Sequence, residues 1–197
     1  MTRIVDRERQ RARLAEALWR LVGREGIRAV SIRKVAAEAG CNRGTVEHYF
    51  PTVDSMLLYA CRHACEQALA QVRYHHRELS GRVALEAILT RDMALYGNRR
   101  TAARIWFGLL ATAVANPQIA DEFVRFDDEM SAILAEIIGE MKARGEASAA
   151  IDAEAEAGRL LAFNLALNLN VVMRPDRYGP EVVEREIDEA LDRLKGT

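Results

Sequence analysis

The residues that suggest metal or redox chemistry are concentrated in one short stretch, at Cys61, His63 and Cys65. Two more histidines, His75 and His76, follow further along. On a helix Cys61 and Cys65 would share a face, because they are four residues apart, whereas His63 would point elsewhere. A structural zinc ion normally takes four ligands from at least two segments. We therefore expect no metal site and no cofactor, and interpret the two thiols as small buried side chains.

The sequence gives no support for nucleophilic or phosphate-transfer chemistry. It contains no glycine-rich phosphate loop, no His-x-x-x-His pair and no Gly-x-Ser-x-Gly nucleophile motif. A redox-sensing role for Cys61 and Cys65 stays open, although nothing in the neighbouring sequence is expected to lower the pKa of either thiol. We therefore expect a protein that is not an enzyme.

Polar side chains that can bind nucleic acid stand close together after a glycine at position 40. They donate and accept hydrogen bonds of the kind that base edges and phosphates require. Val46 and Phe50 are apolar and are expected to point inward. The polar side chains that would then stay outside are those of Asn42, Arg43, Thr45, Glu47, His48 and Tyr49.

Two short helices joined by a tight turn would position these side chains. The spacing predicts one helix over 32–39, capped by Ser31, and a second over 43–49, capped by Asn42. Gly40 between them tolerates the positive φ that such a turn needs. This arrangement is a helix-turn-helix.

Charge is distributed unevenly along the chain. The first fifty residues carry ten Arg and one Lys against six acidic residues, a net charge of +5, whereas the remainder carries −6. A basic head on an acidic body is typical of a protein that contacts a polyanion with one end. Chance clustering of the arginines is the alternative interpretation.

Helical periodicity continues through the rest of the chain, and no window alternates as a strand would. The further predicted helices are 6–24, 54–78 (capped by Asp54), 82–97, 99–115, 118–144, 152–173 and 180–195. We therefore expect an all-α fold of about nine helices. A three-helix head, the helix-turn-helix DNA-binding domain, would occupy 1–53, and a helical bundle would occupy 54–197.

The N-terminal segment resembles the tetracycline-repressor (TetR) family of transcriptional regulators. The resemblance covers about residues 8–60. It is carried by Glu25-Gly26, by the run from Ser31 to Gly40, and by Cys41-Asn42-Arg43-Gly44-Thr45-Val46-Glu47-His48-Tyr49-Phe50-Pro51.

The resemblance implies that helix 43–49 enters the major groove of DNA. Arg43 would make a bidentate contact to guanine, and Thr45 would touch a thymine methyl group or a phosphate. His48 and Tyr49 would grip phosphates, and two residues at the start of the earlier helix would contact the backbone. The expected DNA-binding residues are Ser31, Arg33, Asn42, Arg43, Gly44, Thr45, Glu47, His48 and Tyr49.

One departure from the family pattern affects the predicted grip on DNA. Val53 stands where many members have a lysine that reaches a phosphate. The arginines of the N-terminal tail, Arg3, Arg7 and Arg9, would compensate unless that tail is a solvated extension.

The C-terminal segment 157–194 is similar to the subgroup of choline-responsive, betaine-pathway repressors. The similarity is carried by Arg159-Leu160-Leu161-Ala162, by Arg174-Pro175-Asp176-Arg177 and by the closing amphipathic helix. Many of those relatives have Asp-Gly in mid-helix, where this chain has Leu165-Ala166, so we carry over no ligand.

In this family the second domain binds a small molecule and dimerises, which the resemblance implies for 54–197. Asn164 and Asn168 share a face of an apolar helix and require hydrogen-bond partners, from a ligand or, as we favour, across a dimer face. We interpret each of the large apolar candidates as plain core in preference to pocket wall. The candidate pocket residues are Tyr59, Trp106, Phe107, Leu110, Phe126, Met130, Asn164 and Asn168.

The sequence thus predicts a TetR-like transcriptional repressor that binds a palindromic double-stranded DNA operator as a homodimer and responds to an unknown small-molecule effector. The alternatives are a helical enzyme or ligand-sequestering protein with an incidental helix-turn-helix-like head, and a constitutive DNA-binding protein without effector. No apolar run approaches the ~20 residues that span a bilayer. Three cysteines without a recognisable signal peptide are typical of a reduced compartment, so we expect a cytoplasmic protein without membrane contact.

Overall fold

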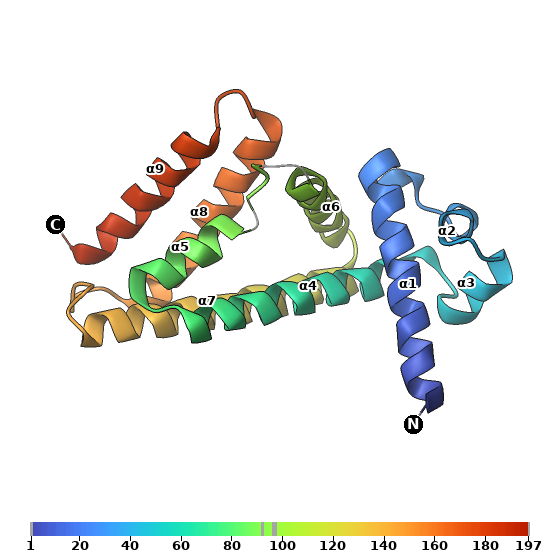
Figure 1. The fold of residues 1–197 in the computed structure, drawn as a ribbon, viewed down its shortest axis with the longest axis horizontal. Coiled ribbons are helices and arrows are strands. Elements are labelled where there is room, and N and C mark those ends of the chain that lie inside the picture. The colour runs from blue at the N-terminus through green and yellow to red at the C-terminus, as the bar shows by residue number, and fades with distance from the viewer. Residues whose placement is uncertain (1, 92, 96–97, 197) are drawn as a thin grey trace. The chain divides into compact units, whose positions relative to one another are not determined.

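The computed structural model describes residues 2–91, 93–95 and 98–196. These residues form nine α-helices and two short 3-10 turns, and no strand occurs among them (Figure 1), which confirms the predicted all-α fold. The elements are α1 (Thr2–Glu25), η1 (Ile27–Ala29), α2 (Ile32–Ala39), α3 (Arg43–Tyr49), α4 (Val53–Glu78), α5 (Gly81–Arg91), α6 (Asn98–Ala113), α7 (Pro117–Ala143), α8 (Ala153–Met173), α9 (Pro180–Asp192) and η2 (Arg193–Lys195).

The first of two compact units contains residues 1–66 and 104–123. Figure 1 shows α1, α2 and α3 packed together in it. Apolar residues at helical spacing on α1 form one buried stripe. α2 adds three buried residues to this core, and α3 adds one. The fully buried side chains of this contact include Leu14, Leu18, Leu21, Val35 and Val46.

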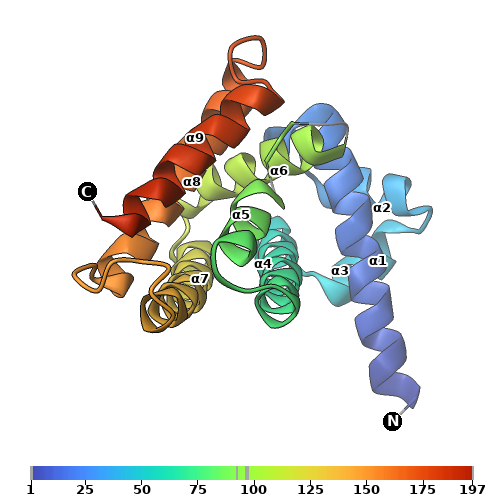
Figure 2. The same ribbon diagram turned by 60° about the vertical axis from the view of Figure 1, so that its left-hand side comes forward.

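The second unit contains residues 67–103 and 124–197. Within it α8 and α9 run antiparallel (Figure 2), and α5 packs against α9. Arg82 on α5 forms ion pairs with Asp188 and Asp192 on α9, each at 2.9 Å. The apolar core of this unit includes Leu85, Ile88, Leu134, Ile137, Leu160, Ile187 and Leu191.

Two predicted helix starts are wrong by a few residues. α1 begins at Thr2 rather than at Asp6, so the tail is helical and is not an irregular extension. α4 is capped by Thr52 rather than by Asp54: the Ser55 N–H donates to Thr52 Oγ1 at 3.0 Å, and the Thr52 N–H donates to Ser55 Oγ at 3.2 Å. This reciprocal capping satisfies two donors of the first turn, which leaves Asp54 inside the helix.

The helix predicted over 82–97 ends earlier, at Arg91. Residues 93–95 form a turn, and the rest of the predicted extension lies outside the described residues. The Ala94 N–H donates to Asn168 Oδ1 at 3.0 Å, so a side chain of α8 replaces the helical carbonyl as its partner. Met93 and Ala94 are each 1% exposed, so this turn is buried.

Asn164 and Asn168 lie on one face of α8, as predicted, and both find backbone partners inside the chain. Asn164 Nδ2 donates to the Leu89 carbonyl at 2.7 Å, and Asn168 accepts from Ala94. The two amides therefore attach α8 to the end of α5 and to the turn after it. These bonds require neither a ligand nor a second copy of the chain.

We predict that Asn168→Ala lowers the free energy of unfolding by about 1–3 kcal/mol, because it leaves the buried Ala94 N–H without its acceptor. Asn170→Ala is the matched control on the same helix, since the one partner of Asn170 Nδ2 among the described residues is the Ala166 carbonyl of α8 itself. Urea denaturation at one fixed protein concentration measures both. Equal destabilisation by the two variants would contradict the assigned role.

Candidate nucleic-acid interface

The turn between α2 and α3 is built as the sequence predicts. Ser31 Oγ accepts from the Lys34 N–H at 3.3 Å and so caps α2. Gly40 has a φ of 65°, in the left-handed region that glycine tolerates best. The Cys41 N–H returns to the Ala36 carbonyl at 3.0 Å, which closes the end of α2 in a Schellman arrangement. The chain can therefore begin α3 two residues after the glycine.

Asn42 fixes the start of α3. Its Oδ1 accepts from the Thr45 N–H at 2.7 Å and from Thr45 Oγ1 at 3.0 Å. The cap predicted for Asn42 is thus confirmed, and the Thr45 hydroxyl takes part in it. Asn42 and Thr45 in this way organise the first turn of the helix that carries the predicted DNA contacts.

α3 has one apolar side and one polar side. Val46 is fully buried and Phe50 is 2% exposed, which confirms their predicted inward orientation. The predicted DNA-binding residues stay at the surface. Those that are exposed are Arg33, Asn42, Arg43, Gly44 and His48, and those that are half-buried are Ser31, Thr45, Glu47 and Tyr49.

Arg43 and Glu47 form an ion pair along the exposed face of α3. Arg43 Nε and Nη2 both lie 2.7 Å from Glu47 Oε1. The side chains are 70% and 40% exposed, so the pair contributes little to stability. The ion pair matters more for geometry than for stability, because Glu47 restricts the direction in which the guanidinium of Arg43 points.

The other arginines of the head fall into two groups. Glu38 on α2 binds Arg24 at 2.8 Å and Arg20 at 3.1 Å. The hydrogen bond from Arg24 and, to a smaller extent, that from Arg20 lower the pKa of Glu38. Arg20 and Arg24 therefore hold α1 to α2. Arg33, in contrast, has no hydrogen-bond or ion-pair partner among the described residues, so its charge is available to a polyanion.

His48 and Tyr49, which the sequence predicts to grip phosphates, lie side by side at the end of α3. His48 and Tyr49 meet edge to face with centroids 5.1 Å apart. Val53, which replaces the usual lysine, is half-buried at the start of α4. Arg7 and Arg9 are exposed on α1, whereas the side chain of Arg3 lies outside the described residues.

Tyr59, a predicted pocket residue, binds α1 instead of standing free. Its hydroxyl donates to Glu8 Oε1 at 3.0 Å, and burial together with Glu8 raises the pKa of Tyr59 to about 12. The Arg11 guanidinium lies 5.8 Å from the Tyr59 ring centroid and 5.9 Å from that of Phe50. Tyr59 therefore belongs to a cluster that connects α1 and α4.

The eight candidate pocket residues divide between the two units, four in each. In the first unit Trp106 meets Phe123 edge to face at 4.9 Å, and Trp106, Phe107 and Leu110 are half-buried on α6. In the second unit Phe126 is half-buried and Met130 is 8% exposed on α7. The remaining candidates are Tyr59 in the first unit and Asn164 and Asn168 in the second.

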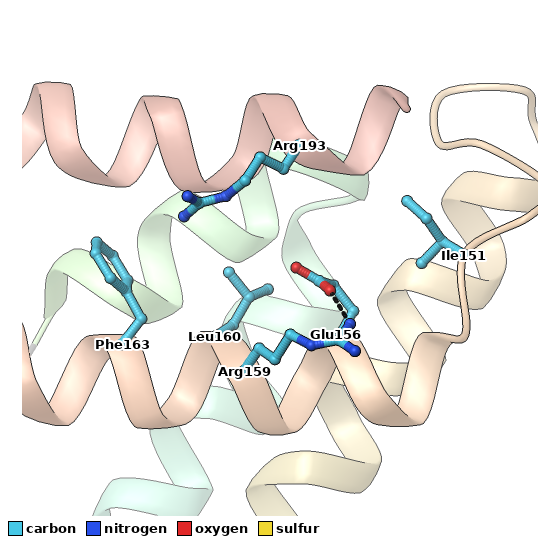
Figure 3. A pocket seen from close by; sticks show the side chains of 6 residues that line it. All are labelled: Ile151, Glu156, Arg159, Leu160, Phe163 and Arg193. Atoms are coloured by element: carbon cyan, nitrogen blue, oxygen red, sulfur yellow. Dashed lines mark hydrogen bonds and ion pairs between the residues drawn. The ribbon is translucent and has the colours of Figure 1, made fainter. Parts of the chain in front are cut away.

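Two hollows open on the second unit, and none of the candidate pocket residues lines either of them. One, of about 310 Å³, lies between α8 and the end of α9 (Figure 3) and is lined by Ile151, Glu156, Arg159, Leu160, Phe163 and Arg193. The other, of about 430 Å³, is lined by Arg82, Met141, Gly145, Glu146, Leu191 and Lys195. Both mix charged ends with aliphatic stems, a pattern that the sequence does not reveal because the lining comes from separate segments.

A buried carboxylate was also missed by sequence reasoning. Glu122 on α7 is 6% exposed and accepts from Arg62 Nε at 3.0 Å. Nearby, Cys61 and Cys65 are buried on α4, as predicted. The hydrogen bond from Cys65 lowers the pKa of the Cys61 thiol, while the same contact and burial raise that of Cys65.

A short, capped helix that presents polar side chains from a basic head defines a helix-turn-helix DNA-binding regulator. The family model for bacterial regulatory proteins of the tetR family matches residues 14–60. The model for the C-terminal region of BetI-type transcriptional repressors matches residues 81–196. The chain therefore belongs to the TetR family of transcriptional regulators, with a BetI-type C-terminal region. Both resemblances inferred from the sequence are confirmed.

Individual relatives agree with this assignment over nearly the whole chain. The HTH-type transcriptional regulator PksA of Bacillus subtilis is 25% identical over 195 residues, which cover 98% of this chain and 94% of PksA. A transcriptional regulator from Rhodococcus sp. Rha1 superposes with a TM-score of 0.83 at 26% identity, covering 93% of this chain and 95% of its own. A regulator from Saccharomonospora viridis, solved in complex with choline, shares the fold with a TM-score of 0.83. Its sequence is 22% identical, and the match covers 96% of this chain and 97% of its own.

We predict opposite stability effects for two glycines of this interface. Gly40→Ala should lower the free energy of unfolding by about 1–2 kcal/mol, because its φ of 65° is unfavourable for alanine although space is free around it. Gly44→Ala should raise it by about 0.5–1 kcal/mol, since Gly44 is helical and its added Cβ would meet Asn42 Oδ1 at an ordinary 3.5 Å. Urea denaturation of both variants decides, and changes of the same sign would refute this account of the turn.

Proposed function

We propose that this TetR-family regulator represses transcription as a homodimer that reads a palindromic operator and is released or recruited by a small-molecule effector. The observation that carries the proposal is the capped helix α3, which presents polar side chains outward from a head of net charge +5. Residues 1–53 would read DNA, and residues 54–197 would bind the effector and dimerise.

α3 fits the dimensions of the major groove, where its first residues would meet base edges. Arg43 would donate a bidentate pair of hydrogen bonds to guanine, and Thr45 would lie beside it. His48 and Tyr49 would bind phosphates, together with Ser31 and Arg33 at the start of α2. Asn42, Gly44 and Glu47 would complete this surface.

In-vitro selection of DNA bound by the full chain tests the proposed reading. We expect an inverted repeat whose half-sites are one helical turn or more apart. The affinity should also fall steeply with salt, because phosphate contacts release counterions. Recovery of no common sequence, with a shallow salt dependence, would instead favour the helical enzyme or ligand-sequestering protein.

The Arg43–Glu47 pair predicts two distinguishable effects on specificity. Arg43→Lys should cost about 1–3 kcal/mol at one base position and relax the preference there, because lysine lacks the planar fork. Glu47→Gln should raise the affinity for non-operator DNA, because it removes a negative charge and releases the guanidinium 2.7 Å away. Operator and scrambled DNA titrated at several salt concentrations separate the two effects.

Arg33→Lys is the matched control for Arg43→Lys, since a phosphate contact carries no sequence information. It should leave the base preferences unchanged. If it alters them as Arg43→Lys does, the assignment of base and phosphate contacts is wrong.

An apolar stripe on α8 supports the homodimer. Leu165, Leu169 and Met173 lie four residues apart along one side of the helix and are 42%, 40% and 70% exposed. Exposed alanines at positions 162 and 166 leave room for close approach of a second helix. Two copies of α8 and α9 related by a twofold axis would cover this stripe, as an isologous interface requires.

We predict that Leu169→Glu converts the dimer to a monomer and lowers operator affinity, because two carboxylates would be buried opposite each other. Val114→Glu is the control, since Val114 is 90% exposed and lies outside α8. Sedimentation velocity measures the oligomeric state. A Leu169→Glu protein that stays dimeric would exclude this face of α8 as the interface.

The effector is tested by titration of ligands into the operator complex. A broad panel should include choline, because a structure similar to this one was solved with it. An effector should change operator affinity by about 5–150-fold, the usual range of allosteric coupling. If no member of the panel alters the affinity, the constitutive DNA-binding alternative is favoured.

A further inference from the structure

α4 and α7 face each other in the second unit through polar side chains at two levels. At the first level Arg73 pairs directly with Glu129. At the next, His76 lies against Glu136 and Glu140, which are four residues apart on α7 and share a face. The two levels differ in kind, because the first pair contains a permanent cation and the second contains an imidazole that can also act as a metal ligand.

The contacts of His76 are too long to be hydrogen bonds. Its Nδ1 lies 4.0 Å from Glu136 Oε2, and its Nε2 lies 3.8 Å from Glu140 Oε1. N–H···O bonds in proteins have lengths of about 2.7–3.2 Å. Each carboxylate thus lies near a different ring nitrogen of His76, and neither is hydrogen-bonded to it.

Charge around this space is incompletely compensated. The second oxygen of Glu140 lies 3.5 Å from Arg144 Nη1, and the same arginine binds Glu146 at 2.7 Å, so its charge is shared. Glu136 has no hydrogen-bond or ion-pair partner other than His76 in the parts of the chain that the structure describes. A divalent cation would neutralise both carboxylates at once.

We propose that His76, Glu136 and Glu140 form a binding site for one divalent transition-metal ion of the zinc type. One candidate ligand atom from each residue lies within 4.8 Å of the others. Tetrahedral zinc, with bonds of about 2.0–2.2 Å, holds its ligands about 3.3–3.5 Å apart. Only one nitrogen of His76 can bind the ion, so the carboxylate that faces the other nitrogen must rotate toward it, and the ligand atoms must approach from separations of up to 4.8 Å. One nitrogen and two oxygen donors suit Zn²⁺, Co²⁺ or Ni²⁺ rather than a thiolate-seeking ion.

The burial of the three side chains fits this adjustment. His76 is 19% exposed and is held between the helices, whereas Glu136 and Glu140 are 65% and 44% exposed and can rotate. Arg144 orients Glu140 from its other oxygen, as an outer partner of a metal ligand does. The fourth position would open to solvent and hold water, and the bound ion would connect α4 to α7.

From the sequence, His76 was a metal-binding candidate only together with Cys61 and Cys65 of the same helix. The structure gives it partners on α7 instead. This site does not depend on the proposed DNA-binding or effector role of the chain.

The test is a zinc titration of the tag-free full-length chain after treatment with EDTA, followed by calorimetry. We expect one ion per chain, visible Co²⁺ absorption bands on substitution, and a melting temperature that rises with metal and returns on chelation. His76→Ala should weaken binding by about 10–100-fold or more. Glu136→Gln should weaken it as well.

Each variant has a matched control. His75→Ala changes the neighbouring histidine and should leave metal affinity unchanged, as should Glu129→Gln, which removes the carboxylate paired with Arg73. Circular dichroism and the melting temperature without metal show that the variants are folded. No binding, equal binding by His76→Ala and the wild type, or loss of binding in Cys41→Ser instead would overturn the proposal.

Discussion

The shortness of α3 is the constraint on which the rest of the head depends. A helix of seven residues does not form stably alone, because few hydrogen bonds repay its nucleation. Only Val46 within it is buried, and its other residues are exposed or half-buried. Its stability must therefore come from its ends, where Asn42 caps the first turn and the buried ring of Phe50 follows the last. The left-handed Gly40 is needed for the same reason, because it lets that cap form directly after α2.

The arginines of the head have two roles: some bind partners within the head, and others are exposed at its surface. Arg20 and Arg24 are bound to Glu38, and Arg13 donates to the Ala39 carbonyl at 3.1 Å at the end of α2. These arginines keep the turn in place, whereas Arg33 and Arg43 extend from the two short helices. The net charge of +5 therefore overstates the charge available to a polyanion, and the position of each arginine relative to an acidic partner matters more than the sum.

Local signals in the sequence predicted the site better than the remainder of the fold. Caps, glycine turns and apolar spacing involve residues within a few positions of each other, which is why α2 and α3 have the predicted bounds. Thr52 was missed because Asp54, two residues later, belongs to a residue type that caps helices better than threonine does. The early end of α5 was missed for another reason: its cause, Asn168, lies far along the chain.

The long-range partners of polar side chains could not be predicted from the sequence either, because they too lie far apart along the chain. The residue type shows that Asn164 needs a partner, but only the packing of α8 against α5 shows that the partner is the Leu89 carbonyl. Likewise, nothing near Glu122 in the sequence indicates that it is buried against Arg62. A buried amide or carboxylate in an apolar helix therefore indicates that a hydrogen-bond partner exists, and it does not by itself indicate a ligand.

The cluster around Tyr59 shows how this applies to regulation. Tyr59 was a candidate pocket residue by type, yet it contacts Phe50 with ring centroids 5.4 Å apart and binds Glu8 of α1. Arg11 Nε is buried in this region without a hydrogen-bond partner among the described residues, so the cluster is not fully satisfied. Through Phe50 the cluster connects α4 to the end of α3, and through Glu8 it connects α4 to α1. An aromatic residue near the start of α4 thus helps to fix the position of α3 through direct contacts, without any ligand.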